Sequence, residues 1–366
     1  MKAICARKDL HEGVQTVSRA VAGRSALPIL NNVLIRTEDA NLRLMSFDLE
    51  MGIECTISAK VETEGALTVP ARLLGEFLST LPESDVVISV DEQNAVNLKC
   101  EKSDYTILGL PPEEFPALPD VPDDRSFEIS QAILKDMIKQ TIFAISPDES
   151  RAILTGVLLI LQGDEIQLVS TDSHRLAVRK SAVAKAAGEA SSIVPGRALA
   201  ELGRMLEEED TGVVVSIADS QIKFQVDGTT VVSRLIEGQF PNYDRVIPKE
   251  CDKKLTMPAE EFLARVRRAS IVARENANRL ILRSEGDRLV VTAESGDVGK
   301  AYEELEVVKE GEDVEIAFNA KYLLDYLSVV DTEGIYMELS AALNPGVLKQ
   351  VGKDDYLYVL MPMQVV

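Results

Sequence analysis

The sequence Val69-Pro70-Ala71-Arg72-Leu73-Leu74-Gly75-Glu76-Phe77-Leu78 decides the fold, because it occurs again further along the chain. The second copy is Val194-Pro195-Gly196-Arg197-Ala198-Leu199-Ala200-Glu201-Leu202. A weaker third copy is Phe318-Asn319-Ala320-Lys321-Tyr322-Leu323-Leu324-Asp325-Tyr326-Leu327. Each copy predicts the start of a helix, with Pro70 and Pro195 at the first helical position and Asn319 as a cap. Apolar residues, Leu73 among them, follow at helical spacing and predict a buried face.

The distance between the copies indicates what is repeated. At roughly 120 residues it is too long for a solenoid unit of about 20–50 residues. It matches a whole domain of about 100–150 residues. We therefore predict an α+β fold of three tandem copies of one domain, at residues 1–123, 124–250 and 251–366.

Within each third, the pattern predicts two halves in which a short strand leads into a helix and further strands follow. The first half opens at Lys2-Ala3-Ile4, at Ser126-Phe127-Glu128-Ile129 and at Lys254-Leu255-Thr256-Met257. Apolar steps of four, three and four residues are typical of a helix lying on a sheet. The six expected helices span residues 8–24, 70–81, 131–145, 195–206, 259–274 and 320–330.

The charge of the chain is unevenly distributed. Sixty acidic residues against 39 basic ones give a net charge of −21, which by itself argues against a phosphate-rich partner. The six helical segments, in contrast, carry a small positive net charge. Arg72, Arg197 and Lys321 occupy the same repeat position, as do Lys139 and Arg267. If the repeat brings the helices to one surface, that surface is mildly basic on an otherwise acidic body.

Several classes of protein are excluded by composition. The apolar runs are far shorter than the ~20 residues of a membrane span, and the first residues lack the apolar core of a signal peptide. The four cysteines, Cys5, Cys55, Cys100 and Cys251, are dispersed without a C-x-x-C pair or a histidine cluster. We therefore expect no membrane association, no metal, no cofactor and a reducing cytoplasm.

The stretch Thr171-Asp172-Ser173-His174 contains the residue types of a hydrolase triad. Adjacent residues on a strand or tight loop do not reach one another as a triad requires. The chain also lacks a Gly-x-Ser-x-Gly elbow and a phosphate-binding loop. We expect no enzymatic activity.

Four further stretches carry a resemblance to a known family. They are Leu27-Pro28-Ile29-Leu30-Asn31-Asn32, Thr171-Asp172-Ser173-His174-Arg175-Leu176-Ala177, Phe240-Pro241-Asn242-Tyr243 and Met361-Pro362-Met363. Together they resemble the bacterial DNA polymerase III beta subunits, the sliding clamps, over the whole chain. The resemblance implies two chains joined head to tail in a ring, with helices lining the hole, sheets outside and duplex DNA passing through. It implies DNA-facing side chains at Arg24, Arg72, Arg197 and Arg204.

The resemblance also implies a peptide-binding pocket at the junction of the second and third domains. Its partners would be the polymerase III alpha subunit, the clamp loader, and other polymerases and repair proteins that carry short peptide motifs. The implied pocket residues are Leu154, Thr171, His174, Arg175, Leu176, Pro241, Arg245, Val246, Asn319, Tyr322, Val359, Met361, Pro362 and Met363. Ala277 stands where some members have an aromatic residue, and Asn344-Pro345-Gly346 is an insertion relative to others. Met361 to Val366 are expected to form an exposed apolar tail, because Pro362 ends strand pairing.

A homodimer contact is implied between Tyr105 of one chain and Ile271 and Val272 of the other. Tyr105 is expected to begin an edge strand, which needs a partner. One alternative stays open from the sequence. A repeat-built acidic scaffold that does not encircle DNA explains the triplication equally well.

Overall fold

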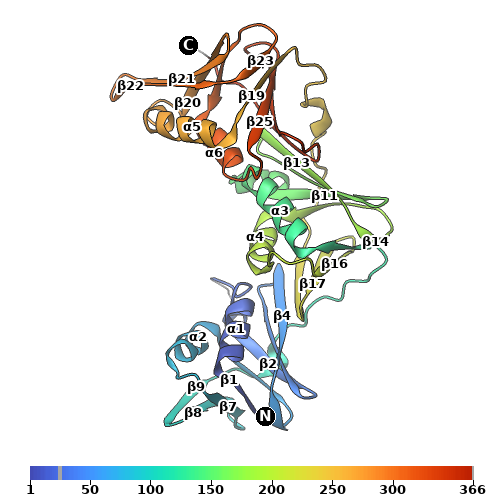
Figure 1. Ribbon diagram of the computed structural model, residues 1–366. Coiled ribbons are helices and arrows are strands. Elements are labelled where there is room, and N and C mark those ends of the chain that lie inside the picture. Colours follow the sequence, from blue (N-terminus) through green and yellow to red (C-terminus); the bar gives the residue numbers. More distant parts are fainter. Residues whose placement is uncertain (24–26, 365–366) are drawn as a thin grey trace. The chain divides into compact units, whose positions relative to one another are not determined.

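The computed structural model describes residues 1–23 and 27–364 (Figure 1). Within them lie six α-helices, which end earlier than predicted in several cases. Their bounds are α1 Arg7–Ser18, α2 Ala71–Thr80, α3 Gln131–Thr141, α4 Gly196–Met205, α5 Ala259–Ala273 and α6 Ala320–Leu327. The prediction that α1 reaches residue 24 is therefore wrong, as is the extension of α6 to residue 330.

The starts of α2, α4 and α6 show how the repeated motif works. Asn319 caps α6 as expected, since its side chain accepts a 2.9 Å hydrogen bond from the Lys321 amide. Pro70 and Pro195 instead close the preceding strands, and each helix begins one residue later. The fixed φ of proline suits this extended position. Leu73 is also not part of the core, because 45% of its surface is exposed.

Two compact units are formed by the described chain, and the division runs through the second third of the sequence. The first unit contains one five-stranded and one nine-stranded sheet, called here sheets A and B. In spatial order, sheet A consists of β5 Lys60–Thr63, β1 Lys2–Ala6, β7 Asp85–Val90, β8 Ala95–Cys100 and β9 Ser103–Leu108. Sheet B consists of β14 Ala184–Ala187, β10 Ser126–Ser130, β16 Gly212–Ile217, β17 Gln221–Val226, β18 Thr229–Arg234, β4 Met51–Ser58, β3 Asn41–Phe47, β2 Asn32–Glu38 and β6 Ala66–Pro70.

The second unit likewise contains a nine-stranded sheet C and a smaller, four-stranded sheet D. Sheet C consists of β15 Ala190–Pro195, β11 Gly156–Gln162, β12 Glu165–Thr171, β13 Arg175–Ala182, β27 Tyr356–Leu360, β26 Gly346–Gln350, β25 Gly334–Leu339, β19 Lys253–Pro258 and β23 Val308–Glu310. Sheet D consists of β22 Gly299–Glu306, β21 Arg288–Ser295, β20 Arg279–Glu285 and β24 Glu315–Asn319. Helices α5 and α6 lie side by side in this unit, and α5 also packs on β21 and β22 (Figure 1).

The nine-stranded sheets cross the predicted domain boundaries. In sheet B, β18 of the second domain pairs antiparallel with β4 of the first. In sheet C, β13 of the second domain pairs antiparallel with β27 of the third. We call these two ladders the intrachain joints. Neighbouring domains are thus joined by backbone hydrogen bonds. The sequence pattern predicted the domains but not these bonds between them.

Packing at the joint in sheet C is mostly apolar. One core cluster lies under the helices and includes Phe262, Phe318, Tyr326, Tyr356 and Tyr358. A second cluster, on Leu176, Val178 and Val359, is covered by the segment that follows β18, including Phe240 and Tyr243. This connecting segment therefore packs on the sheet and forms one wall of the site described next.

Candidate peptide-binding site

A cavity of about 180 Å³ opens beside the joint between β13 and β27. Seven of the fourteen predicted pocket residues line it, namely Thr171, Arg175, Leu176, Pro241, Val246, Val359 and Met361. Three further residues line the cavity but were not predicted, although all of them lie within the quoted motifs: Ser173, Asn242 and Tyr243. Its floor is apolar, since Leu176 and Val359 are almost fully buried.

The turn between β12 and β13 shapes one side of the cavity. Oδ1 of Asp172 accepts hydrogen bonds from the amides of His174 (2.8 Å) and Arg175 (3.1 Å). The Thr171 hydroxyl donates to the Arg175 carbonyl at 2.6 Å. Ser173 has φ +80°, in the left-handed region that glycine adopts more readily than other residues. The hydrogen bonds of the Asp172 and Thr171 side chains therefore hold the backbone at Ser173 in a conformation that a non-glycine residue rarely adopts.

Arg175 is the buried polar centre of the site. Its guanidinium donates to Asp172 Oδ2 at 3.0 Å, to Asp325 Oδ2 at 2.6 Å and to the Phe143 carbonyl at 2.5 Å. It also lies over the Tyr322 ring, 4.4 Å from the ring centre. A charge with only 7% of its surface exposed is tolerable because these partners satisfy it. We call Arg175 and these four partners the Arg175 cluster.

The Arg175 cluster also places two predicted residues that do not line the cavity. Tyr322 is half-buried beneath Arg175, and burial followed by the Asp172 charge raises the pKa of its hydroxyl. Asn319 caps the helix that carries Tyr322 and Asp325. Both residues hold the wall rather than form its surface.

The remaining predicted residues surround the cavity in different ways. Leu154 is buried in the 3-10 helix Glu149–Thr155, whereas the side chains of His174 and Arg245 are exposed. Pro362 and Met363 are half-buried. The expected exposed tail is therefore wrong for residues 361–363. The Met361 amide donates to the His174 carbonyl at 2.9 Å and the Met363 amide donates to the Ala317 carbonyl at 2.7 Å. Val365 and Val366 lie outside the described residues.

The opposite wall comes from the connecting segment after β18. The 3-10 helix Tyr243–Arg245 places Tyr243 against sheet C, where Gln167 donates to its hydroxyl at 2.6 Å. Burial, and then the adjacent Asp244, raises the pKa of Tyr243. Ala277, by contrast, is exposed in a turn with φ +52° and does not line this cavity.

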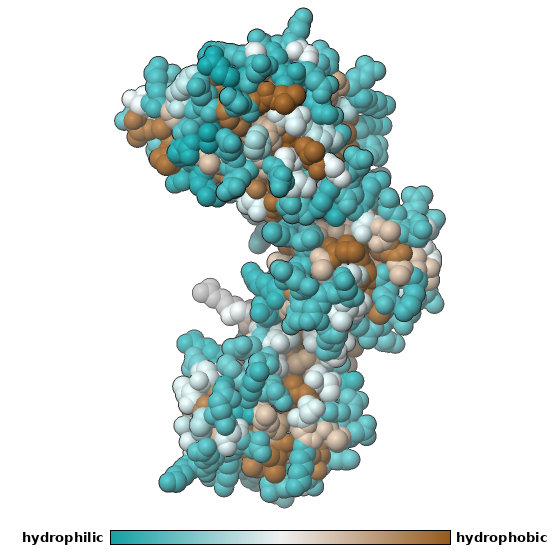
Figure 2. All heavy atoms as spheres, viewed as in Figure 1, coloured by the Kyte–Doolittle hydropathy of each residue, from teal (hydrophilic) through white to brown (hydrophobic). Residues whose placement is uncertain are grey.

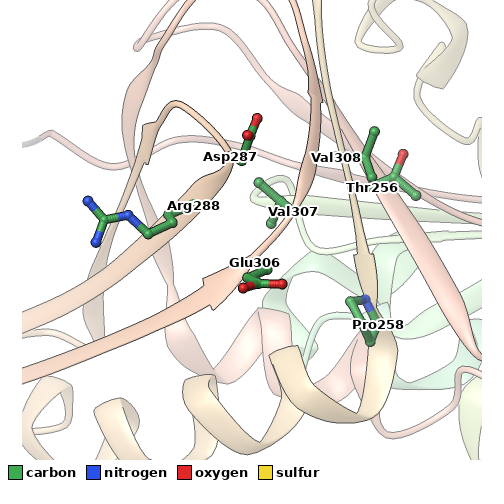
Figure 3. Close-up of a pocket in the computed structure, with 7 residues that line it drawn as sticks. All are labelled: Thr256, Pro258, Asp287, Arg288, Glu306, Val307 and Val308. Carbon is green, nitrogen blue, oxygen red and sulfur yellow. The ribbon is translucent and has the colours of Figure 1, made fainter.

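A larger hollow of about 490 Å³ lies at the corner of sheets C and D (Figure 3). Its lining residues are Thr256, Pro258, Asp287, Arg288, Glu306, Val307 and Val308. The labelled side chains in Figure 3 point in different directions, and Arg288 is already paired with Glu304 at 3.3 Å. None of the predicted site residues lies there. The smaller apolar cavity is therefore the better binding site.

Predicted DNA-facing residues occupy helix surfaces. Arg72 is 90% exposed on α2 and forms a 2.8 Å ion pair with Glu76. Arg197 is exposed on α4, and Arg204 of the same helix pairs with Glu201. Arg24 lies outside the described residues. Figure 2 shows that hydrophilic residues cover most of the visible face, with apolar residues in small separate patches.

Comparison with known proteins assigns the chain to a family. Models of the N-terminal, central and C-terminal domains of the DNA polymerase III beta subunit match residues 1–119, 128–242 and 244–364. The chain belongs to this family. The three-domain clamp fold is thereby confirmed, whereas the boundaries at residues 123 and 250 remain predictions.

Relatives of the beta-subunit family match along most or all of the chain. The beta sliding clamp of Synechococcus elongatus is 36% identical, covering 100% of this chain and 99% of the relative. The one from Staphylococcus aureus is 33% identical over 94% of each chain. The solved sliding clamp of Bacillus subtilis superposes with a TM-score of 0.97 at 29% identity, covering both chains completely. A Pseudomonas aeruginosa sliding clamp solved with griselimycin bound has a TM-score of 0.96 at 32% identity, again over both whole chains.

Proposed function

We propose that two copies of this chain form a closed head-to-tail ring that encircles duplex DNA and tethers DNA polymerase to it. The observation that carries this proposal is the match of all three clamp domains along the whole chain. The alternative of a scaffold without DNA has no support from the relatives, which are beta sliding clamps.

DNA inside the ring would meet few strong positive charges. Arg72, Arg197 and Arg204 are exposed, but Arg72 and Arg204 each form an ion pair with a neighbouring carboxylate. Phosphate contacts of this kind are weak and independent of base sequence. Weak contacts suit a ring that is held by its closed shape and moves along the duplex. Arg24 completes the proposed set.

The cavity beside β13 and β27 is the proposed docking site for short peptides of partner proteins. Its apolar floor suits leucine- or phenylalanine-type side chains, and Arg175 and Thr171 add polar groups to the lining. Met361 adds an adaptable wall, because methionine side chains fit different partners. The proposed partners are the polymerase III alpha subunit, the clamp loader, and other polymerases and repair proteins.

The protein would act without catalysis, cofactor or metal, in the cytoplasm. The Asp172 carboxylate binds Arg175 and two backbone amides, so it does not orient the His174 ring. No helix in the described part of the chain is long and apolar enough to cross a membrane. No group of three or more potential metal ligands gathers among the described residues.

Retention on DNA tests the ring. Protein loaded on a nicked circular DNA should survive a salt wash that removes ordinary phosphate contacts, and cutting the circle should release it. Equal loss from intact and cut circles would contradict encirclement.

Reversing Arg72, Arg197 and Arg204 to Glu should weaken loading without lowering the melting temperature much, because exposed changes usually alter stability by less than about 0.5 kcal/mol. Arg283→Glu, in β20, is a control on an exposed strand residue for each of the three single Arg→Glu changes.

Peptide capture is tested separately. A fluorescent peptide ending in Leu-Phe should bind with an affinity that falls at least tenfold in Met361→Ala. Leu343→Ala, which removes a 71% exposed side chain that does not line the cavity, should leave the affinity unchanged. Equal affinities in both variants would place the docking site elsewhere.

A further inference from the structure

The peptide cavity lies beside one of the two intrachain joints, and the other joint is built in the same way. In sheet C, Leu176 faces Val359 across the ladder, and both form the cavity floor. In sheet B, Gly52 faces Val232 in the same manner. Gly52 and Leu176 each lie four residues after the aspartate of the preceding turn. The chain therefore contains two joints at which a cavity of this kind can form.

Backbone hydrogen bonds show that the two joints correspond residue by residue. The Met361 amide donates to the His174 carbonyl at 2.9 Å beside the cavity, and the Arg234 amide donates to the Glu50 carbonyl at 2.8 Å in the other joint. In both turns the aspartate accepts hydrogen bonds from the amides two and three residues further along the chain. The same backbone frame is thus present at both joints.

The connecting segments that cover the two joints also correspond. Each contains a Phe-Pro pair, Phe115-Pro116 in the first segment and Phe240-Pro241 in the second. Leu118 packs on the apolar cluster of sheet B, and Tyr243 packs on the equivalent cluster of sheet C. Each of these side chains lies three residues after the phenylalanine of its pair. Leu118 therefore occupies the position that Tyr243 has in the wall of the cavity.

The two joints differ in where this side chain goes. A β-carbon on Gly52 would collide with Cδ2 of Leu118 and would lie 3.1 Å from Cδ2 of Phe47. Leu118 therefore extends from the connecting segment down to the strand, into the space that the Leu176 side chain takes in sheet C. Tyr243, in contrast, remains in the wall of an open cavity. We call the Leu118 side chain the plug.

The residues after Leu118 hold the plug in place. Pro119 disfavours a helical conformation at the residue before it. The described segment from residue 116 to residue 122 accordingly contains no helical turn, whereas Tyr243–Arg245 form a 3-10 helix. Lys223 of β17 donates to the Val121 carbonyl at 2.9 Å. The segment is thus anchored to sheet B directly after the plug.

We propose that the joint in sheet B is a second peptide site, which the chain closes with its own Leu118. This inference rests on the proposed function, because the ligand is again a short peptide with a leucine- or phenylalanine-type side chain. The occupant is itself a leucine on a segment without helical turns, so the site already holds the kind of group that it would bind. One joint of each chain is therefore open to partner peptides and the other is closed.

Removing the plug tests this proposal in the full-length protein. The probe is the fluorescent Leu-Phe peptide, and Met361→Ala is present in every variant to weaken the open cavity. Adding Leu118→Ala should raise the peptide affinity about tenfold above that of Met361→Ala alone. Leu110→Ala is the matched control, since it makes the same change at another partly buried leucine that packs on the same cluster. It should give no gain.

A second variant covers the case in which the emptied space collapses. Gly52→Leu combined with Leu118→Ala supplies the floor residue of sheet C while the plug is removed, and it should show the same gain in affinity. Without Met361→Ala, native mass spectrometry should find one peptide bound per wild-type chain and two per chain of either unplugged variant.

The outcomes separate this proposal from the proposed function. No gain in either unplugged variant overturns the second site. An equal gain in Leu110→Ala also overturns it, because loosening the cluster at any point would then be enough. If Met361→Ala leaves the affinity of the otherwise wild-type chain unchanged, the docking site in sheet C is wrong, whereas a gain from Leu118→Ala still supports the site in sheet B.

Discussion

The guanidinium carbon of Arg175 lies 4.4 Å from the centre of the Tyr322 ring, and its Nη1 bonds Asp325 at 2.6 Å, one turn along the same helix. A side chain of the second domain is thereby enclosed by the sixth helix of the third. The joint in sheet C consequently combines backbone pairing with a buried charge network, and the proposed peptide cavity lies beside that network.

Replacing Arg175 by alanine should destabilise the second unit by about 3–5 kcal/mol, because Asp172 would remain buried without its cation. Peptide affinity should fall with it. Denaturant unfolding measures the first effect and anisotropy the second. Arg72→Ala, at a 90% exposed side chain, should change stability by less than about 0.5 kcal/mol. A similar small change in Arg175→Ala would mean that the network contributes little.

Tyr326 and Tyr356 form a matched pair for testing a buried hydroxyl. The Tyr356 hydroxyl donates to the Gln140 carbonyl at 2.8 Å, whereas that of Tyr326 has no hydrogen-bond partner within residues 1–23 and 27–364. Tyr326→Phe should therefore raise stability by about 1 kcal/mol, and Tyr356→Phe should lower it by about the same amount. Thermal unfolding at neutral pH measures both. Equal effects of the two changes would contradict the assignment.

The same pair predicts alkaline behaviour. Burial raises the pKa of both Tyr326 and Tyr356 above the ordinary value of 10.0. As the pH rises, these hydroxyls lose their protons in the unfolded chain before they do so in the folded one. Their contribution to the free energy of unfolding is therefore fully present below pH 10 and is lost as the pH rises beyond it. Tyr326→Phe should lessen this fall, measured by denaturant unfolding between pH 9 and pH 11. An unchanged slope would show that Tyr326 is hydrated in solution.

Ser173 and Leu49 occupy equivalent turns, with φ of +80° and +77°. In each turn an aspartate, Asp48 or Asp172, accepts hydrogen bonds from the backbone amides two and three residues further along the chain. Leu49→Gly should raise stability by about 1 kcal/mol without affecting peptide binding, because it relieves backbone strain away from the cavity. Ser173→Val should cost about 2 kcal/mol and weaken peptide binding, since a β-branched residue resists this conformation. Unchanged peptide affinity in Ser173→Val would show that the turn does not shape the site.

Deleting residues 362–366 should leave a folded ring that no longer binds the peptide. The deletion removes the hydrogen bond from the Met363 amide to the Ala317 carbonyl. Met361 then keeps only the hydrogen bond from its own amide to the His174 carbonyl. Deleting only residues 364–366 keeps that bond and should preserve affinity. Anisotropy with the Leu-Phe peptide compares the two proteins. Full affinity in the longer deletion would separate the cavity from the C-terminal segment.

Local sequence patterns predicted the elements well because they depend on near neighbours. The apolar spacing after Pro70, Pro195 and Asn319 located three helices to within a residue or two of their starts. Leu73 was wrongly assigned to the core, since helical spacing alone cannot tell which of two neighbouring apolar positions the rest of the chain covers.

Long-range contacts could not be read in this way. Asp325 lies 150 positions from Arg175, and no local pattern links an arginine after a turn to a carboxylate on a distant helix. Ser173, Asn242 and Tyr243 were missed as lining residues for a related reason, although they belong to recognisable motifs. Which side chains of a motif face a cavity depends on the strand register and on the fold of the connecting segment.

The order of strands in sheets B and C governs how the chain can fold while it is being synthesised. β4 is complete by Ser58, but its neighbour β18 begins only at Thr229. β13 ends at Ala182 and waits for β27, the last strand of the chain. The first and second nascent domains therefore each present an unpaired edge to the surrounding proteins until the partner strand has been made, and such edges favour aggregation. These two edges are covered only after β18 and β27, respectively, have left the ribosome.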